Sequence, residues 1–242
     1  MRKIKIYWGF KGPAGSQLLV EPMVGVLKDV SVNKDTLSGI EYEEYKKCPA
    51  HIKYFKNTFV VKAFTDITLE HRVLVDGMAT LSSPTHDQEG YNAHVDARII
   101  ENSDFQLVQL EWNMFMFTDK DIEVSQIPAT IHVNPFLRDT IQVSGIMNIS
   151  KWFRPIRPAF FIPKNGSVTI KRGDALYYIK VHSTEPLELI QFNMGEELEN
   201  LANDCLLLKL HKSRASLKSL YGWFTKARYQ TRVLNGIKKN LR

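Results

Sequence analysis

Three residues of the sequence have the types and the spacing that could hold a metal ion. His94 and Asp96 stand two positions apart in the stretch AHVDA, and His182 ends the stretch ALYYIKVH. Positions i and i+2 of a β-strand share a face, so His94 and Asp96 could reach one ion. Two histidines and one carboxylate can occupy one face of an Fe(II) and leave positions open for oxygen and a cosubstrate. A mononuclear iron oxygenase is therefore one hypothesis.

The residues that follow His182 argue against this metal site. An oxygenase that uses 2-oxoglutarate usually places an arginine or lysine shortly after the distal histidine, to pair with the cosubstrate carboxylate. The stretch HSTEPLELIQFNM offers Glu185 and Glu188 instead. The histidine pattern of cupins is absent as well. We therefore expect no cofactor, keep Fe(II) only under the oxygenase alternative, and expect His94 and Asp96 to be surface or loop-edge polar residues.

Other catalytic signatures are absent from the sequence. It holds no GxSxG, no GxGxxG and no P-loop. Cys48 and Cys205 have no neighbouring cysteine, so we interpret them as reduced, small hydrophobic residues in a cytosol-like compartment. The triplet RGD at 172–174 predicts a tight turn, in which Gly173 adopts a positive φ and Asp174 accepts local backbone N–H bonds. The sequence as a whole leans away from an enzyme.

The positive charge of the chain is concentrated at its C-terminal end. The formal net charge is +6, but residues 209–242 hold ten Lys and Arg and no Asp or Glu. The rest of the chain has 22 basic and 26 acidic residues. A mildly acidic body thus carries a strongly basic tail, and such an asymmetry is a clue about partners.

The basic tail has three interpretations. It could bind nucleic acid through residues 213–242, because Trp223 and other aromatic residues interleave with Lys218, Lys226 and Arg228. It could lie on an anionic membrane as an amphipathic helix. It could also dock on an acidic surface of another subunit or of this protein's own body, with a solvated basic face.

Two further arginines stand in the stretch FRPIRPAFF. The prolines beside Arg154 and Arg157 favour an extended edge or connector, which would hold both side chains in place. Such a pair could bind a carboxylate or a phosphate. It could equally be a pair of charges that protects a sheet edge from pairing.

The elements that must position these residues are mostly strands. Alternating or β-branched runs predict strands at 2–9, 59–64, 71–75, 105–118, 140–150 and 187–194, with a possible bulge at Gly145 and a strand–turn–strand hairpin over 162–182. In 105–118 one face carries Val108, Leu110, Trp112, Met114 and Met116, and the other carries Phe115 and Phe117. Many strands at short spacing favour a mainly β fold, an antiparallel β-sandwich of jelly-roll type.

Helices are expected at 48–57 and over much of the C-terminal segment. Acidic residues begin the stretch 195–213 and lysines end it, which suits the helix dipole, and Leu198, Leu201, Cys205 and Leu208 form one apolar stripe. A further helix over 216–242 is expected to break near Asn235-Gly236. The sequence therefore predicts a β-sandwich domain at 1–194 with a helix inserted near 48–57. A helical basic segment at 195–242 packs on that domain or extends from it.

The stretch FRPIRPAFFIPKNGSVTIKRGDALYYIKVH resembles a family of small β-rich proteins of unknown function encoded by tailed phages, including marine phages, and by bacteria. The resemblance runs from Pro163 through Gly166, Val168, Lys171 and Gly173 to Tyr178, with Ala175 where the family often has proline. The stretches 47–64 and 216–224 are similar to pieces of marine-phage members. The resemblance implies a phage or phage-like origin and a β-fold, and it carries no activity over.

These observations favour a non-enzymatic accessory or structural protein that binds a protein partner or itself. The basic N-terminus MRKIKIYWGF is not followed by an apolar run, and no run of about 20 apolar residues occurs. We therefore expect neither a signal peptide nor a transmembrane segment, and we place the protein in the cytoplasm of an infected host cell or in the virion.

Overall fold

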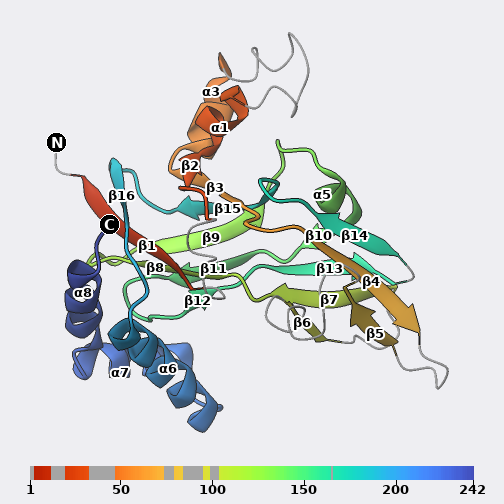
Figure 1. Cartoon of the computed structure of the whole chain (residues 1–242). Helices are drawn as coiled ribbons and strands as arrows, with labels where there is room; N and C mark the ends of the chain where they lie inside the picture. The colour runs from red at the N-terminus through yellow and green to blue at the C-terminus, as the bar shows by residue number, and fades with distance from the viewer. Residues whose placement is uncertain are drawn as a thin grey trace.

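The chain forms a mainly β structure with helices at its C-terminal end (Figure 1). The computed structural model describes residues 3–11, 20–32, 47–73, 79–83, 95–98, 104–164 and 166–242. Within these residues there are sixteen strands in four sheets and six helices. The helices are α1 (Val26–Val32), α3 (Pro49–Phe55), α5 (Pro135–Asp139), α6 (Glu196–His211), α7 (Leu217–Lys226) and α8 (Tyr229–Lys239).

Two of the sheets are built around strands that follow one another in the chain. The β1 sheet has the order β12 (Pro155–Ile156), β8 (Asn113–Phe117), β1 (Ile4–Lys11) and β16 (Leu187–Gln191). The β7 sheet has the order β10 (Ile141–Gln142), β13 (Ala159–Pro163), β7 (Phe105–Leu110) and β6 (Val95–Arg98). Because β7 leads into β8 and β12 leads into β13, one long bent strand pair runs through both sheets.

The other two sheets are joined in the same way. The β15 sheet has the order β11 (Gly145–Asn148), β9 (Glu123–Pro128), β15 (Ala175–Val181), β3 (Thr58–Lys62) and β2 (Val24–Gly25). The β4 sheet has the order β14 (Ser167–Ile170), β4 (Ile67–Val73) and β5 (Ala79–Ser82). Here β3 leads into β4 and β14 leads into β15, and these strands form a second long antiparallel pair.

Strand β1 has a parallel neighbour, which the sequence did not predict. Ile4 to Trp8 pair in parallel with Leu187 to Gln191 of β16, and every other pairing among the described strands is antiparallel. This pairing brings the end of the β-rich part of the chain back to its beginning. The helices α6, α7 and α8 therefore start beside the β1 sheet (Figure 1).

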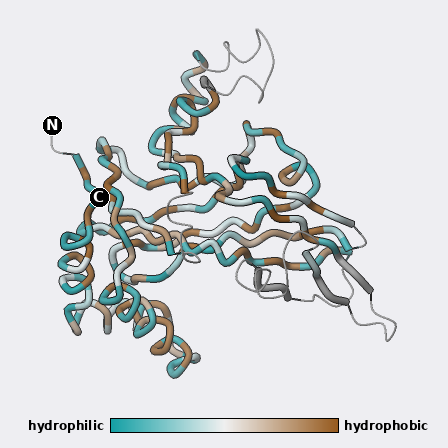
Figure 2. Tube along the Cα trace, viewed as in Figure 1, coloured by the Kyte–Doolittle hydropathy of each residue, from teal (hydrophilic) through white to brown (hydrophobic). Residues whose placement is uncertain are grey.

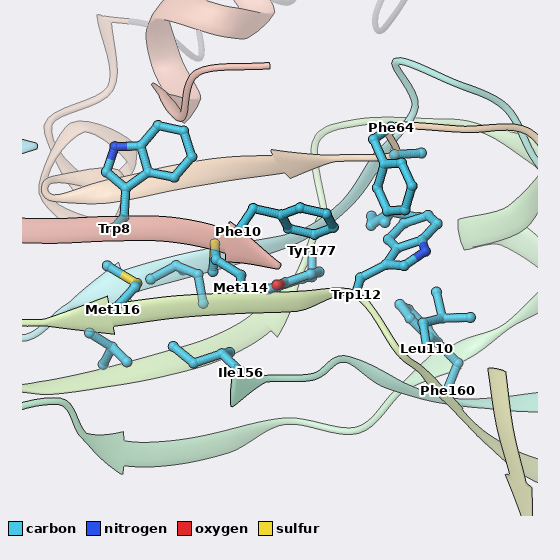
Figure 3. Close-up of a cluster of buried hydrophobic side chains, with 14 of the residues drawn as sticks. Trp8, Phe10, Phe64, Leu110, Trp112, Met114, Met116, Ile156, Phe160 and Tyr177 are labelled. Carbon is cyan, nitrogen blue, oxygen red and sulfur yellow. The ribbon is translucent and has the colours of Figure 1, made fainter. Parts of the chain in front are cut away.

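The largest hydrophobic core draws side chains from all four sheets. It includes Trp8 and Phe10 of β1, Met114 of β8, Phe160 of β13 and Tyr177 of β15, all of which are buried (Figure 3). Burial of apolar surface on this scale is the dominant favourable contribution to folding. A second core lies between the β1 sheet and the C-terminal helices, and a third lies around α1 and α3.

The predicted central strand 105–118 is divided into two. Residues Glu111 and Trp112 interrupt it, and the backbone N–H of Met114 donates to the carbonyl of Trp112 over 2.8 Å. The prediction of one continuous strand is therefore wrong, although its two faces are confirmed. Met114 and Met116 enter the largest core, while Phe115 and Phe117 enter the second core under the helices.

For the predicted hairpin at 162–182, the predicted strand pairing is wrong, and the predicted turn at Gly173-Asp174 is confirmed. Strand β14 pairs with β4, and β15 pairs with β3 and β9, so the two strands are not hydrogen-bonded to each other. Gly173 has a φ of 88°, and the side chain of Asp174 accepts a hydrogen bond from the backbone N–H of Lys171 over 2.9 Å. The turn thus moves the chain from one sheet to the next. The local sequence specifies the turn, and the flanking strands find longer-range partners.

Two other predicted boundaries are also corrected. The stretch 140–150 is not one strand, because β10 and β11 belong to different sheets, and Gly145 begins β11 without forming a bulge. The C-terminal helix breaks at Arg228, whose φ is 57°, and not at Asn235-Gly236. Gly236 lies inside α8, where a Cβ would come within 2.8 Å of a Leu198 methyl group, so this glycine permits close packing of α8 on α6.

Candidate functional site

The C-terminal half of α6 exposes apolar side chains that would ordinarily be buried. Leu206, Leu207 and Leu210 are exposed at 51%, 52% and 64%, and Leu217 at the start of α7 is exposed as well. The face of α6 that packs on the body behaves differently, because Leu198, Leu201 and Cys205 are buried in the second core. Figure 2 shows the hydrophobic colouring along the end of α6 that projects from the body. We call Leu206, Leu207 and Leu210 the leucine surface.

A pocket of about 390 Å³ lies beside the leucine surface. Leu206 and Leu210 line it from α6, and Phe115 and Trp152 line it from the body. A fully exposed helix face has no such recess, so this site combines an apolar rim with a depression that could receive a side chain of a partner.

The two predicted arginines both line this pocket. The guanidinium of Arg157 donates to Glu111 over 2.8 Å and to Asn113 over 2.7 Å, so its charge is compensated. Arg154 makes no hydrogen bond or ion pair with the other described residues. The arginine pair therefore does not act as one clamp, and Arg154 is the member that could bind an anionic group.

The basic tail is docked on the body through its aromatic residues. Phe224 is fully buried, and the half-buried Trp223 ring lies 4.7 Å from the Tyr229 ring and 6.2 Å from the Trp152 ring, measured between centroids. Tyr229 donates a hydrogen bond to Asp204 of α6 over 2.8 Å. The aromatic residues that could have stacked on nucleic acid are thus engaged in packing.

The cations of the tail mostly face outward. Among the described residues, seven of its ten cationic side chains make no hydrogen bond or ion pair: Lys209, Lys212, Arg214, Lys218, Lys226, Arg228 and Lys238. Several of them flank the leucine surface, which has no carboxylate in its own stretch because Asp204 is the last acidic residue of the chain. The structure thus combines exposed leucines with uncompensated positive charge.

Only two of the three predicted metal ligands, Asp96 and His182, lie within the described residues, and they lie on separate elements. His94 lies outside the described residues. Asp96 lies on β6, which Figure 1 places well away from the end of β15 where His182 follows. His182 is exposed, and its Nε2 lies 2.6 Å from the Oγ of Ser125. In the part of the chain that the structure describes, no three His, Cys, Asp or Glu side chains are arranged to hold a metal ion.

A buried polar chain that the sequence did not reveal links α1 to the β15 sheet. Asp29 Oδ2 lies 2.9 Å from His132 Nε2, and His132 Nδ1 lies 2.6 Å from the hydroxyl of Tyr178. Lys62 pairs with the other oxygen of Asp29 at 2.9 Å. Asp29 and His132 are 40 or more residues from each other and from Tyr178, and no motif connects them in the sequence.

The protonation states in this chain are determined by burial and by its hydrogen bonds. Burial lowers the pKa of His132, although Asp29 opposes this shift, so the ring is neutral. Burial alone would raise the pKa of Asp29, but the hydrogen bonds from Lys62 and His132 lower it below its usual range. A neutral His132 donates through Nε2 to the Asp29 carboxylate and accepts through Nδ1 from Tyr178.

This arrangement resembles an acid–base relay, but its three side chains are buried in the part of the chain that the structure describes. Asp29, His132 and Tyr178 are exposed at 5%, 6% and 0%, and none of the three lines a described pocket. A general base must come within hydrogen-bond reach of a substrate proton. We therefore interpret these hydrogen bonds as a structural contact between α1 and the β15 sheet. Cys205 is unreactive for a similar reason, because burial raises the pKa of its thiol to about 12.

Comparisons with known proteins identified no relative of this chain. No protein-family model, no curated protein and no solved structure matches the chain. Among the described residues, no helix is long and apolar enough to cross a membrane. The candidate site is thus defined by its own geometry, and the leucine surface with its pocket is the strongest candidate.

Proposed function

We propose that this protein is a non-enzymatic binding protein that docks a protein partner through the leucine surface and the adjoining pocket. One observation carries the proposal: three leucines of one helix are exposed by half or more although the same helix buries its preceding apolar residues. Isolated exposed leucines are ordinary, whereas a contiguous apolar patch rimmed by polar residues marks an interaction site.

The partner that this site fits is acidic and amphipathic. The site carries Arg154, Lys209 and Lys212 without compensating carboxylates, and its apolar part has a recess for one large side chain. Complementary charge would steer such a partner and fix its orientation, while the leucines and the pocket would supply most of the affinity. A helix or strand with apolar residues on one face and carboxylates at its margins satisfies both requirements.

The proposal includes a role in phage assembly or as a phage accessory factor, in the host cytoplasm or in the virion. The resemblance of Pro163 to Tyr178 to a phage-encoded family supports this part. It also includes an arrangement of the sheets as a β-sandwich of jelly-roll type. The two long bent strand pairs, which contribute side chains to one common core, support that arrangement.

The docking site can be tested with a designed peptide. We would measure the affinity of a labelled amphipathic helix, with leucines on one face and glutamates on the other, by fluorescence anisotropy. We expect binding that weakens at least tenfold in the double variant Leu206→Ser, Leu210→Ser, which corresponds to a loss of roughly 1.4 kcal/mol. A peptide with lysine in place of glutamate is the control and should bind much more weakly.

Two results would count against this assignment. Equal binding of the acidic peptide by the wild type and the double variant would show that the leucine surface is not the site. A concentration-dependent dimer that forms in the wild type and disappears in the double variant would make a second copy of this chain the occupant. Sedimentation velocity over a range of concentrations distinguishes this outcome.

A further inference from the structure

A second surface, independent of the leucine surface, is an open groove that is lined by lysines. The groove has a volume of about 1540 Å³ and lies where five separate parts of the chain meet. Lys3 and Lys5 come from the start of β1, Lys53 from α3, Lys120 from the β8–β9 connection and Lys238 from α8. Figure 1 shows the start of β1 and α8 near the two chain ends, and α3 at the top of the view. Only the folded chain brings these charges together.

Most of these lysines make no direct ion pair. Seven lysines line the groove, and the five named above make no hydrogen bond or ion pair with other described residues. The other two are held by backbone carbonyls: Lys56 donates to Thr184 over 3.1 Å and Lys180 to Tyr54 over 2.8 Å. A hollow lined by one sign of charge concentrates the electrostatic field and attracts ions of the opposite sign.

Carboxylates reduce this charge without cancelling it. Four acidic side chains share the lining, so the seven lysines leave a surplus of three positive charges. One of the four, Asp121, is already paired with Lys151, which lies outside the lining, and it accepts from Asn148 over 2.6 Å. The lining also contains His182, Ser183 and Thr184, which offer further hydrogen-bonding groups.

We propose that this groove binds the phosphodiester backbone of single-stranded nucleic acid. The cations are spread along a hollow and not gathered at one point, which suits a chain of phosphates better than a single anion. Each lysine acts as a point charge, and the described lining holds no arginine that could bind one phosphate through two parallel hydrogen bonds. A concave groove admits a flexible single strand, whereas a rigid duplex would contact only its rims.

The binding should depend on phosphates and not on bases. Tyr7 is the one Phe, Tyr or Trp residue in the described lining, and it is buried at 7% exposure, so it offers no face on which a base could stack. Stacking on aromatic side chains is what usually supplements backbone contacts in single-strand binding. We therefore expect modest, sequence-independent and strongly salt-dependent affinity. The site also differs from the basic tail, because Lys238 is the only tail residue in the lining.

Two matched triple variants test this assignment. Lys53→Gln, Lys120→Gln, Lys238→Gln removes three charges from the groove, and Lys218→Gln, Lys226→Gln, Arg228→Gln removes three from the tail. All six side chains are exposed, so both proteins should fold, which thermal unfolding would confirm. The probe is a labelled 20-nucleotide oligothymidine, and its affinity is measured by fluorescence anisotropy from 50 to 200 mM salt.

We expect the groove variant to bind at least tenfold more weakly at 50 mM salt than the wild type. The slope of log K against log salt should fall by about 2, because each phosphate contact with a single strand contributes about 0.7. The tail variant should keep the wild-type slope. No binding at 50 mM salt, equal losses in the two variants, or tighter binding of a duplex of the same length would each overturn the proposal.

Discussion

Two regions of the molecule depart from the usual placement of residue types. The hydrogen-bonded polar side chains around His132 are buried, and the leucines at the end of α6 are exposed. Asp29, His132 and Tyr178 are the types that perform acid–base chemistry, and they are sealed in the interior. Leu206, Leu207 and Leu210 are the types that form cores, and they are exposed on a projecting helix. The contrast teaches that residue type alone does not determine which side chains a partner or substrate can reach. Accessibility is the reason why we propose a structural role for the polar chain and a binding role for the leucines.

The largest expected effect separates the two halves of α6. Leu198→Ala should lower the free energy of unfolding by about 3 kcal/mol, because Leu198 is fully buried against α8 and its loss leaves a cavity. Leu206→Ala is the matched control on the same helix and should change it by less than about 0.5 kcal/mol. Urea denaturation followed by circular dichroism measures both. Similar losses in the two variants would show that the end of α6 is buried against the body.

The next effect concerns the buried polar chain. His132→Ala should cost about 2 kcal/mol, because it removes two buried hydrogen bonds, one to Asp29 Oδ2 and one to the Tyr178 hydroxyl. His182→Ala removes a ring that also makes one short hydrogen bond but is exposed, and it should cost less than about 1 kcal/mol. The two chemical denaturation midpoints give the comparison. Peptide binding at the leucine surface should be unchanged in both variants, and a loss in His132→Ala alone would refute a purely structural role.

The pH dependence of stability provides a smaller effect with a definite sign. Because the pKa of His132 is lower in the folded protein than its unfolded value of about 6.5, the unfolded state binds more protons below that pH. Stability should therefore decrease as the pH falls from 7.5 to 5.5. In His132→Ala this part of the decrease should be absent, so the midpoints of the two proteins converge at low pH. A constant difference between them would contradict a neutral buried histidine.

The smallest effect concerns the hydrogen bond from Tyr229 of α8 to Asp204 of α6, which lies near the point where α6 projects from the body. Tyr229→Phe removes the hydrogen bond to Asp204 and should lower the free energy of unfolding by about 1 kcal/mol. Burial, and then Asp204, raise the pKa of Tyr229, so the lost group is a neutral hydroxyl at every ordinary pH. Hydrogen exchange should increase in the C-terminal turns of α6 more than in its first turns. Uniform exchange along the helix would show that Asp204 is not this boundary.

Local features of the fold were predictable because neighbouring residues determine them. The alternation in 105–118 predicted which side chains face each core. The local sequence from Lys171 to Asp174 predicted the turn that these residues form. The apolar stripe of α6 predicted the burial of Leu198, Leu201 and Cys205. Period and turn chemistry act over a few residues, so one sequence suffices to find them.

The partners of each strand, and both candidate surfaces, required the tertiary structure. Nothing near Ile4 indicates a parallel pairing with Leu187, and nothing near Asp29 indicates His132, because these contacts span 100 or more residues. The basic tail was visible in the sequence, but its docking through Phe224 and Trp223 was not. The pattern of residues along the sequence thus determined a mainly β chain with a basic, helical C-terminal end. Long-range packing alone decided which leucines and lysines remain exposed.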